Sequence, residues 1–135
     1  MITTTQYFGK WGSDATPTIL KAADNLLSKV NALIAHMVAC GIEFKANPAT
    51  NSLVSGHNYG GFRPQDCPEG APKSAHKVGM AVDLYDPNGK IDAWLLANEK
   101  LLDHFGLWFE HPDDTKGWSH FSTRKPKSGK IFFHP

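Results

Sequence analysis

Two short segments of the sequence carry side chains whose types suit a metal ion. The first, Ser74 to Asp83, contains His76 near its start and Asp83 at its end, and the second contains Trp118 and His120. Two imidazoles and a carboxylate are ligands that zinc prefers, and a site with three protein ligands leaves a fourth position for water, as catalytic zinc sites do. Such a zinc lowers the pKa of its bound water to about 7. The sequence thus predicts a Zn2+ site at His76, Asp83 and His120, with a buried hydrogen-bonded network without metal as the alternative interpretation.

The residues around these candidates indicate how the candidates are positioned. Residues 79–85 alternate between two faces as a strand does, which places Asp83 and Ala81 on the same face. The small Ala81 side chain leaves space beside the carboxylate, and Gly79 allows the chain to turn before the strand. We therefore expect His76 at the end of a loop and Asp83 on the strand that follows.

The remaining elements are predicted from local signals. Thr16 is a candidate helix cap before Pro17, apolar residues then recur at helical spacing up to residue 40, and Gly41 provides a stop. The other expected elements are an extended segment over 42–56, a long loop over 57–73, a turn over 86–89, a helix over 91–104, strands over 107–110 and 118–122 joined by a polar loop, and a short strand over 131–133. Helices and strands are interspersed with short connections, which predicts one α+β domain over residues 1–135, with a small, mainly antiparallel sheet and helices packed on it.

Composition and charge limit the classes of function. A net charge of +1 gives no reason to expect nucleic acid or an acidic membrane as a partner. The chain has no apolar run of membrane-spanning length, so we expect no membrane insertion, and we expect a monomer. A basic cluster near the C-terminus is interpreted as a solvated loop, with attraction to anionic polymers as the alternative. Its members are Arg124, Lys125, Lys127 and Lys130.

The two metal-binding segments resemble motifs of a known family. Residues 74–83 fit the pattern Ser-x-His-x-x-Gly-x-Ala-x-Asp at every fixed position, and residues 118–120 fit Trp-x-His. Together they resemble the zinc D-alanyl-D-alanine carboxypeptidases and the related phage L-alanyl-D-glutamate endolysins, which share the hedgehog/DD-peptidase fold. The resemblance implies that fold, zinc as the metal, and the peptides of bacterial peptidoglycan as the substrate.

The resemblance also implies a glutamate that acts as general base. Some branches of the family have this glutamate three residues before the last histidine ligand, where this chain has Gly117. Other branches have it at the end of the preceding strand, and Glu110 fits that position. If the strands on either side of the loop pair as a hairpin, Glu110 lies near His120, and we expect it to be the base. The other candidates for this role are His111, Asp113 and Asp114.

Substrate binding is the least specific part of the resemblance. The family has an arginine after a Ser-Gly pair, and here Arg63 follows Ser55-Gly56 only after an insertion. An arginine can bind both oxygens of a carboxylate at once, so Arg63 is expected to bind the substrate or polarise its scissile carbonyl. Ser74, Tyr59 and Trp118 are further expected substrate-binding residues, and Trp118 could instead be a core residue.

These expectations favour a zinc metallopeptidase that cuts peptidoglycan stem peptides, as a phage or prophage endolysin does. The alternatives are a D-alanyl-D-alanine carboxypeptidase and a non-catalytic zinc-binding structural module of a phage particle. The N-terminus lacks the pattern of a signal peptide, so we expect synthesis in the cytoplasm and access to the cell wall by another route. Cys40 and Cys67 are expected to be free thiols, with a single disulfide between them as the alternative outside the cytoplasm.

Overall fold

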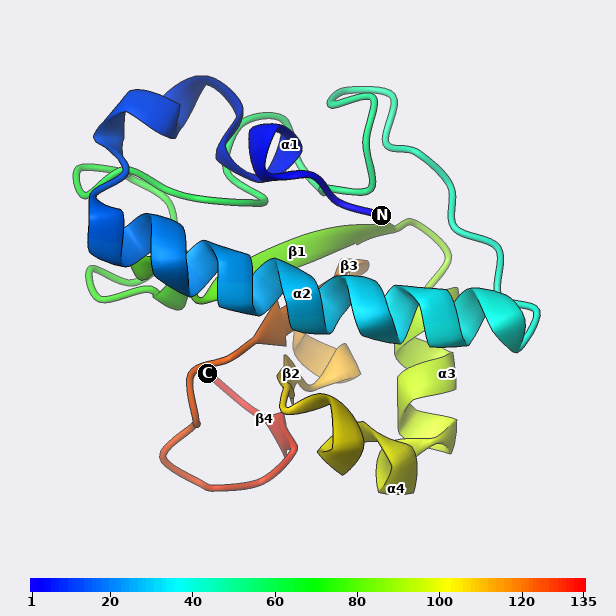
Figure 1. Cartoon of the computed structure of the whole chain (residues 1–135). Coiled ribbons are helices and arrows are strands. Elements are labelled where there is room, and N and C mark those ends of the chain that lie inside the picture. The colour runs from blue at the N-terminus through cyan, green and yellow to red at the C-terminus, as the bar shows by residue number, and fades with distance from the viewer.

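The computed structural model describes residues 1–135, and its longest element is the helix α2, Pro17–Ala39. The Thr16 side chain caps its first turn by accepting a hydrogen bond from the Ile19 amide at 3.2 Å. Pro17 suits this turn because its missing amide hydrogen would have no partner there. The apolar stripe of α2 is buried, and the helix runs across one face of the sheet (Figure 1). The helix predicted from this stripe is confirmed.

Four short strands form a mixed sheet in the order β1-β3-β2-β4. They are β1 (Ala81–Asp86), β2 (Trp108–Glu110), β3 (Gly117–Ser122) and β4 (Phe132–Phe133). The central strand β3 pairs antiparallel with β1 and with β2, whereas β4 pairs parallel with β2. The predicted α+β class is therefore confirmed, with one parallel pairing at the edge of the sheet.

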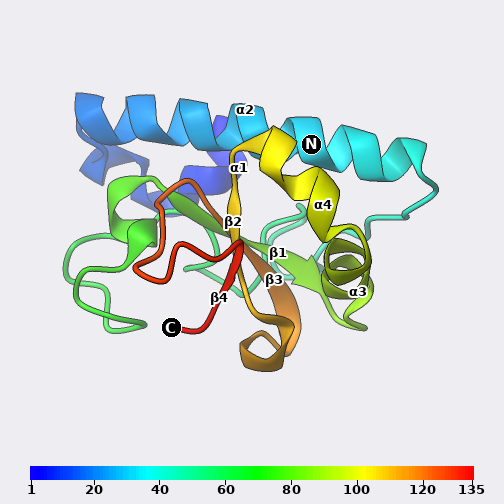
Figure 2. The same cartoon turned by 90° about the horizontal axis from the view of Figure 1, so that it is seen from below.

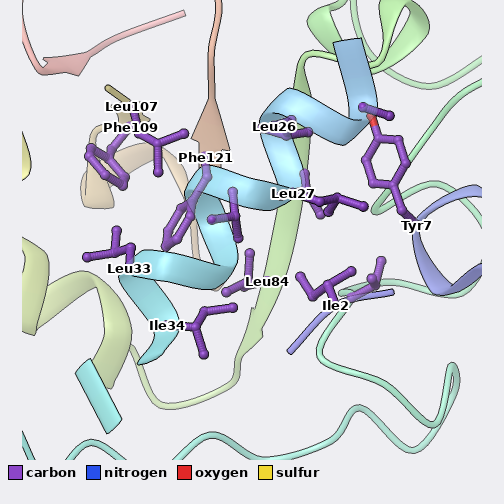
Figure 3. Close-up of a cluster of buried hydrophobic side chains, with 14 of the residues drawn as sticks. Ile2, Tyr7, Leu26, Leu27, Leu33, Ile34, Leu84, Leu107, Phe109 and Phe121 are labelled. Atoms are coloured by element: carbon purple, nitrogen blue, oxygen red, sulfur yellow. The ribbon is translucent and has the colours of Figure 1, made fainter. Parts of the chain in front are cut away.

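The strand register separates a core face of the sheet from a polar face. Leu84 on β1 lies opposite Ser119 on β3, and Phe109 lies opposite Phe121. Phe109, Phe121 and Leu84 are buried against α2 (Figure 3). Because side chains alternate along a strand, Asp83 points to the other face, where its register partner is His120.

Two helices and a 3-10 turn replace the single helix that the sequence predicts over residues 91–104. Helix α3 spans Lys90–Ala97, α4 spans Glu99–Leu102, and the 3-10 turn follows at Asp103–Phe105. Asn98 separates α3 from α4. Its side-chain amide and its backbone amide both donate to the Trp94 carbonyl, at 2.8 and 3.1 Å, and its φ of −121° departs from the helical value. Asparagine competes with the helix backbone in this way, so the prediction of one continuous helix is wrong.

Residues 42–56 are also less regular than predicted. Two isolated bridges, Asn47 with Ser52 and Val54 with Leu84, replace the expected continuous extended segment. The Asn47 side chain holds this segment by donating to the carbonyls of Val54 and Gly56 at 3.0 and 2.7 Å. Residues 57–73 contain no helix or strand, as the loop prediction states.

The N-terminal segment forms structure that the sequence reasoning did not anticipate. Helix α1 spans Thr4–Phe8, and a capping box between Thr3 and Gln6 caps its first turn. A 3-10 turn follows at Gly9–Asp14. The Tyr7 hydroxyl donates to the Ala81 carbonyl at 3.0 Å, and the Tyr7 carbonyl accepts from the Phe62 amide at 3.0 Å. Through these two hydrogen bonds, Tyr7 connects β1 to the loop over residues 57–73. The Thr-x-x-Gln pattern was the available signal.

The core lies between α2 and the sheet. It is one cluster of 21 buried apolar residues from the four α-helices, from β1, β2 and β3, and from the connecting segments that carry Ile2, Val54, Phe62 and Leu107. Figure 2 shows α2 along one side of the molecule, with the strands, α3 and α4 beneath it. None of the helices combines the length and apolar character that crossing a membrane requires. Cys40 is exposed and Cys67 is buried, and both are free thiols, as predicted.

Candidate metal centre

The polar face of the sheet brings the three predicted metal ligands together. The Asp83 carboxylate lies on β1 and His120 lies opposite it on β3, while His76 approaches from the turn before β1. Asp83 Oδ1 is 2.7 Å from His120 Nδ1 and 3.4 Å from His76 Nε2. One ligand atom from each residue lies within 4.8 Å of the others, and the three residues are at most 9% exposed. This buried group could hold a metal ion.

The two distances from Asp83 can be compared with those around a bound metal ion. Tetrahedral zinc with bonds of about 2.0–2.1 Å separates its ligand atoms by about 3.3 Å. The distance from Asp83 to His76 already has this value, and the hydrogen bond from Asp83 to His120 would have to lengthen by about 0.6 Å. His76 Nδ1 lies 2.8 Å from the Gly61 carbonyl, which leaves its Nε2 directed at Asp83. Such an outer partner is what metal-binding histidines usually have.

A tight turn positions His76. The 3-10 turn Ala75–Val78 begins at Ser74, whose hydroxyl accepts a hydrogen bond from the His76 amide at 3.3 Å. It ends at Gly79, which adopts φ +77° against α2; a Cβ there would lie 2.7 Å from the Ile19 carbonyl. Ser74 therefore caps this turn, and its contact with substrate stays a prediction.

Burial and mutual contact set the protonation states of the group. Burial by itself would raise the pKa of Asp83, but the neighbouring His76 and the hydrogen bond with His120 hold that pKa well below its ordinary value. Burial lowers the pKa of His76, against the opposing effect of Asp83. An ionised aspartate and a neutral histidine are the forms that bind a metal, and the pKa shifts of Asp83 and His76 favour these forms.

Arg63 lies beside the metal group. Its Nη2 is 3.5 Å from Asp83 Oδ2, and its Nε donates to the Tyr59 carbonyl at 2.8 Å. Gly70 packs so closely on the guanidinium that any side chain there would collide with it. The insertion before Arg63 thus still delivers the arginine to the site.

A cleft of about 390 Å³ opens beside the group. Asp83 forms part of its wall together with Arg63, Tyr59 and Trp118, three of the predicted substrate-binding residues. Glu69 also lines the cleft. Trp118 is half-buried and lies two positions before His120 on the same strand face, so it faces the cleft rather than the core.

Glu110 ends β2 close to the metal group. Strand β2 pairs Trp108 with Ser122 and Phe109 with Phe121. Because side chains alternate along a strand, the next residue, Glu110, lies on the same face of the sheet as His120. Burial raises the pKa of Glu110; His120 opposes this shift, and the charge of Asp83 adds to it. The strands on either side of the loop thus pair as a hairpin, as the prediction for Glu110 requires.

The other candidates for the base are engaged elsewhere. Asp113 has a side chain that is 76% exposed, and Asp114 Oδ2 is 2.6 Å from His134 Nδ1. His111 Nδ1 accepts from the Asp113 amide at 3.1 Å, and its ring stacks on His134 with centroids 4.6 Å apart. Glu110 is therefore the candidate that the strand register directs toward His120.

One contact near the site has no counterpart in the sequence reasoning. Asp92, on α3, is buried and accepts hydrogen bonds from Ser119 Oγ at 2.6 Å and Thr115 Oγ1 at 2.8 Å. Ser119 immediately precedes His120. Asp92 is far from Thr115 and Ser119 in the chain, and the three residues follow no motif. Their spacing in the sequence therefore does not predict the contact.

Comparison with known proteins adds no relative: no family model, curated protein or solved structure matches this chain. What the site can do follows from its own geometry and from the motifs over residues 74–83 and 118–120. An ionised carboxylate and two imidazoles beside an open cleft can bind a divalent metal and expose it to a molecule in that cleft.

Proposed function

We propose that the chain is a zinc-dependent metallopeptidase with a hedgehog/DD-peptidase fold, and that it hydrolyses peptidoglycan stem peptides as a phage or prophage endolysin does. The observation that carries the proposal is the convergence of His76, Asp83 and His120 beside a cleft that also holds Arg63. The motif resemblance supports zinc as the metal and the bacterial wall as the source of substrate.

The residues around the group suit peptide hydrolysis. A zinc ion on these ligands would supply a Lewis acid and lower the pKa of bound water toward about 7. Glu110 takes the proton of the attacking water and passes it to the leaving amine. Its raised pKa favours the first step, because a carboxylate with a higher pKa is a stronger base when ionised. The second step remains favourable because the leaving amine is far more basic than a carboxylate.

Arg63 and the aromatic residues of the cleft orient the peptide. Stem peptides carry free carboxylates, and the guanidinium of Arg63 is suited to bind one in a forked pair of hydrogen bonds. Trp118 and Tyr59 form apolar walls next to it. This arrangement holds the scissile bond between Glu110 and the metal ligands.

The position of Arg63 also favours a second candidate, a D-alanyl-D-alanine carboxypeptidase. An arginine 3.5 Å from a metal ligand could bind the terminal carboxylate of a substrate whose last residue is removed. Purified cell wall distinguishes the two reactions: an endopeptidase solubilises wall fragments, whereas a carboxypeptidase releases free alanine and leaves the wall intact.

Replacing Glu110 tests the proposed chemistry. We expect Glu110→Gln to retain zinc and to lower kcat on stem peptides by about 10²–10⁴-fold, because the amide cannot accept the proton. The matched control Asp113→Asn changes an exposed carboxylate in the same loop and should leave kcat unchanged. Full activity in Glu110→Gln would exclude it as the base, and zinc binding by a wild type that cuts no wall peptide would instead indicate a non-catalytic module.

A further inference from the structure

A buried carboxylate on the core side of β3 connects helix α3 to β3 and to the loop that precedes β3. We propose that Asp92 is a positioning residue, which fixes the strand carrying His120 and the loop that joins this strand to Glu110. The inference rests on the proposed function, because it concerns the geometry of the same metal group.

Both oxygens of the Asp92 carboxylate are used. Oδ1 accepts from the Ser119 hydroxyl at 2.6 Å, and Oδ2 accepts from the Thr115 hydroxyl at 2.8 Å. Asp92, Ser119 and Thr115 are 4%, 0% and 3% exposed. A carboxylate buried this far is costly unless its oxygens are hydrogen-bonded, and its bonds to Ser119 and Thr115 restrain both partners.

The helix end that carries Asp92 is itself fixed. The Asp86 carboxylate, at the end of β1, accepts from the backbone amides of Ile91 and Asp92 at 3.0 Å each. Asp86 also lies opposite Gly117, the first residue of β3. The first turn of α3 is thus held to β1, and Asp92 connects this fixed point to β3.

The two hydroxyls that Asp92 binds belong to the strand that carries His120 and to the loop that follows Glu110. Ser119 precedes His120 and points to the opposite face of β3, so restraining Ser119 restrains the rotation of the strand that aims His120 at Asp83. Thr115 lies in the segment that connects Glu110 to β3. The carboxylate therefore restrains the strand that carries His120 and the loop that follows Glu110. It does so from the core face of the sheet, where it touches neither metal nor substrate. Small displacements of His120 or Glu110 are expected to weaken metal binding.

The test measures zinc affinity by competition with a chelator, and ligand geometry by the visible absorption of the Co2+-loaded protein. We expect Asp92→Ala and Ser119→Ala each to weaken zinc binding by about 10–100-fold and to change the Co2+ spectrum. Asp92→Asn should restore part of the affinity, because its amide can still bond both hydroxyls if one of them rotates to accept. Ser119→Ala removes a single oxygen and serves where Asp92→Ala does not fold.

Asn31→Ala is the control for a loss of stability alone. Asn31 lies on α2 and makes two hydrogen bonds to the backbone of Ile2, at 2.7 and 2.9 Å, near the N-terminus of the chain. This variant should lower Tm and leave zinc affinity unchanged. Unchanged affinity and an unchanged Co2+ spectrum in folded Asp92→Ala or Ser119→Ala would overturn the inference, as would an equal loss of affinity in Asn31→Ala. A wild type that binds no zinc would instead refute the proposed function, and the inference with it.

Discussion

Asp83 is the residue on which the candidate metal centre depends, because three cationic or polar groups approach its carboxylate. His120, His76 and Arg63 lie within 2.7, 3.4 and 3.5 Å of its oxygens. Without such partners a buried ionised carboxylate would be strongly unfavourable. The same contacts keep Asp83 ionised and leave it ready to bind a cation.

The lowered pKa of His76 predicts a pH dependence of the metal-free protein. The unfolded chain takes up a proton near the ordinary histidine pKa of 6.5, whereas folded His76 resists protonation. The unfolded state then binds more protons, so the free energy of unfolding should fall as pH drops below about 6.5, by at most about 1.4 kcal/mol per pH unit for this residue. Asp83, whose pKa is also lowered, adds a further loss below about 3.8.

Urea unfolding of chelator-treated protein between pH 7.5 and 5 measures this dependence. The control is His76→Gln, which should show a shallower slope over the same range because the titrating group is absent. A free energy of unfolding that rises as the wild type is acidified would contradict the assignment of a neutral, buried His76.

The site residues that could be predicted are those that share a local motif or a strand register. His76 and Asp83 lie in one segment of the sequence. His120 follows Trp118 on a predicted strand, and the short polar loop before this strand indicates that it forms a hairpin with the strand that ends at Glu110. Asp92 could not be predicted because its hydrogen bonds to β3 cross from a helix that is distant in the chain. The Ser74 hydroxyl caps the turn before His76, and its position in the motif does not by itself indicate this role.

At the scale of elements, the turn before β1 packs closely against the backbone of α2. Gly79 has φ +77°, and its Cα lies against the backbone of α2 at Ile19 and Ala23. We expect Gly79→Ala to destabilise the protein by about 3 kcal/mol, because the left-handed conformation costs about 1–2 kcal/mol and the methyl group must also displace α2.

Gly89→Ala is a matched control for that prediction. Gly89 has φ +69°, but a Cβ there would meet no atom within 4 Å. It should therefore cost only the conformational part, about 1–2 kcal/mol. Denaturant unfolding of the two variants measures the difference, and equal destabilisation would show that the contact with α2 has no energetic weight.

The elements differ in how far local sequence determines them. Helix α2 has a cap, a first-turn proline and a long apolar stripe, and both of its ends could be predicted. The break at Asn98 depends on one side chain competing for one carbonyl, which the apolar pattern of residues 91–104 does not reveal. The parallel pairing of β4 with β2 joins segments across a long loop, so only the folded chain shows it.

For the whole molecule, the size of the core indicates that folding does not require the metal. The 21-residue apolar cluster lies between α2 and the sheet (Figure 3). The strand register places Asp83 and His120 on the opposite face of the sheet. We expect chelator-treated protein to unfold cooperatively, and added zinc to raise Tm with concentration because it binds only the folded state. Thermal unfolding followed by circular dichroism measures both effects, and loss of the cooperative transition on chelation would contradict this view of the core.

The most direct measurement is the zinc content of the purified protein after zinc loading, with hydrolysis of cell wall assayed on the same samples. The comparison uses wild type, His120→Ala and the control His104→Ala, which changes an exposed histidine on the 3-10 turn after α4. We predict about one zinc per chain and wall hydrolysis in wild type and in His104→Ala, with both lost in His120→Ala. A wild type without zinc, or a His120→Ala variant that retains zinc and activity, would contradict the account.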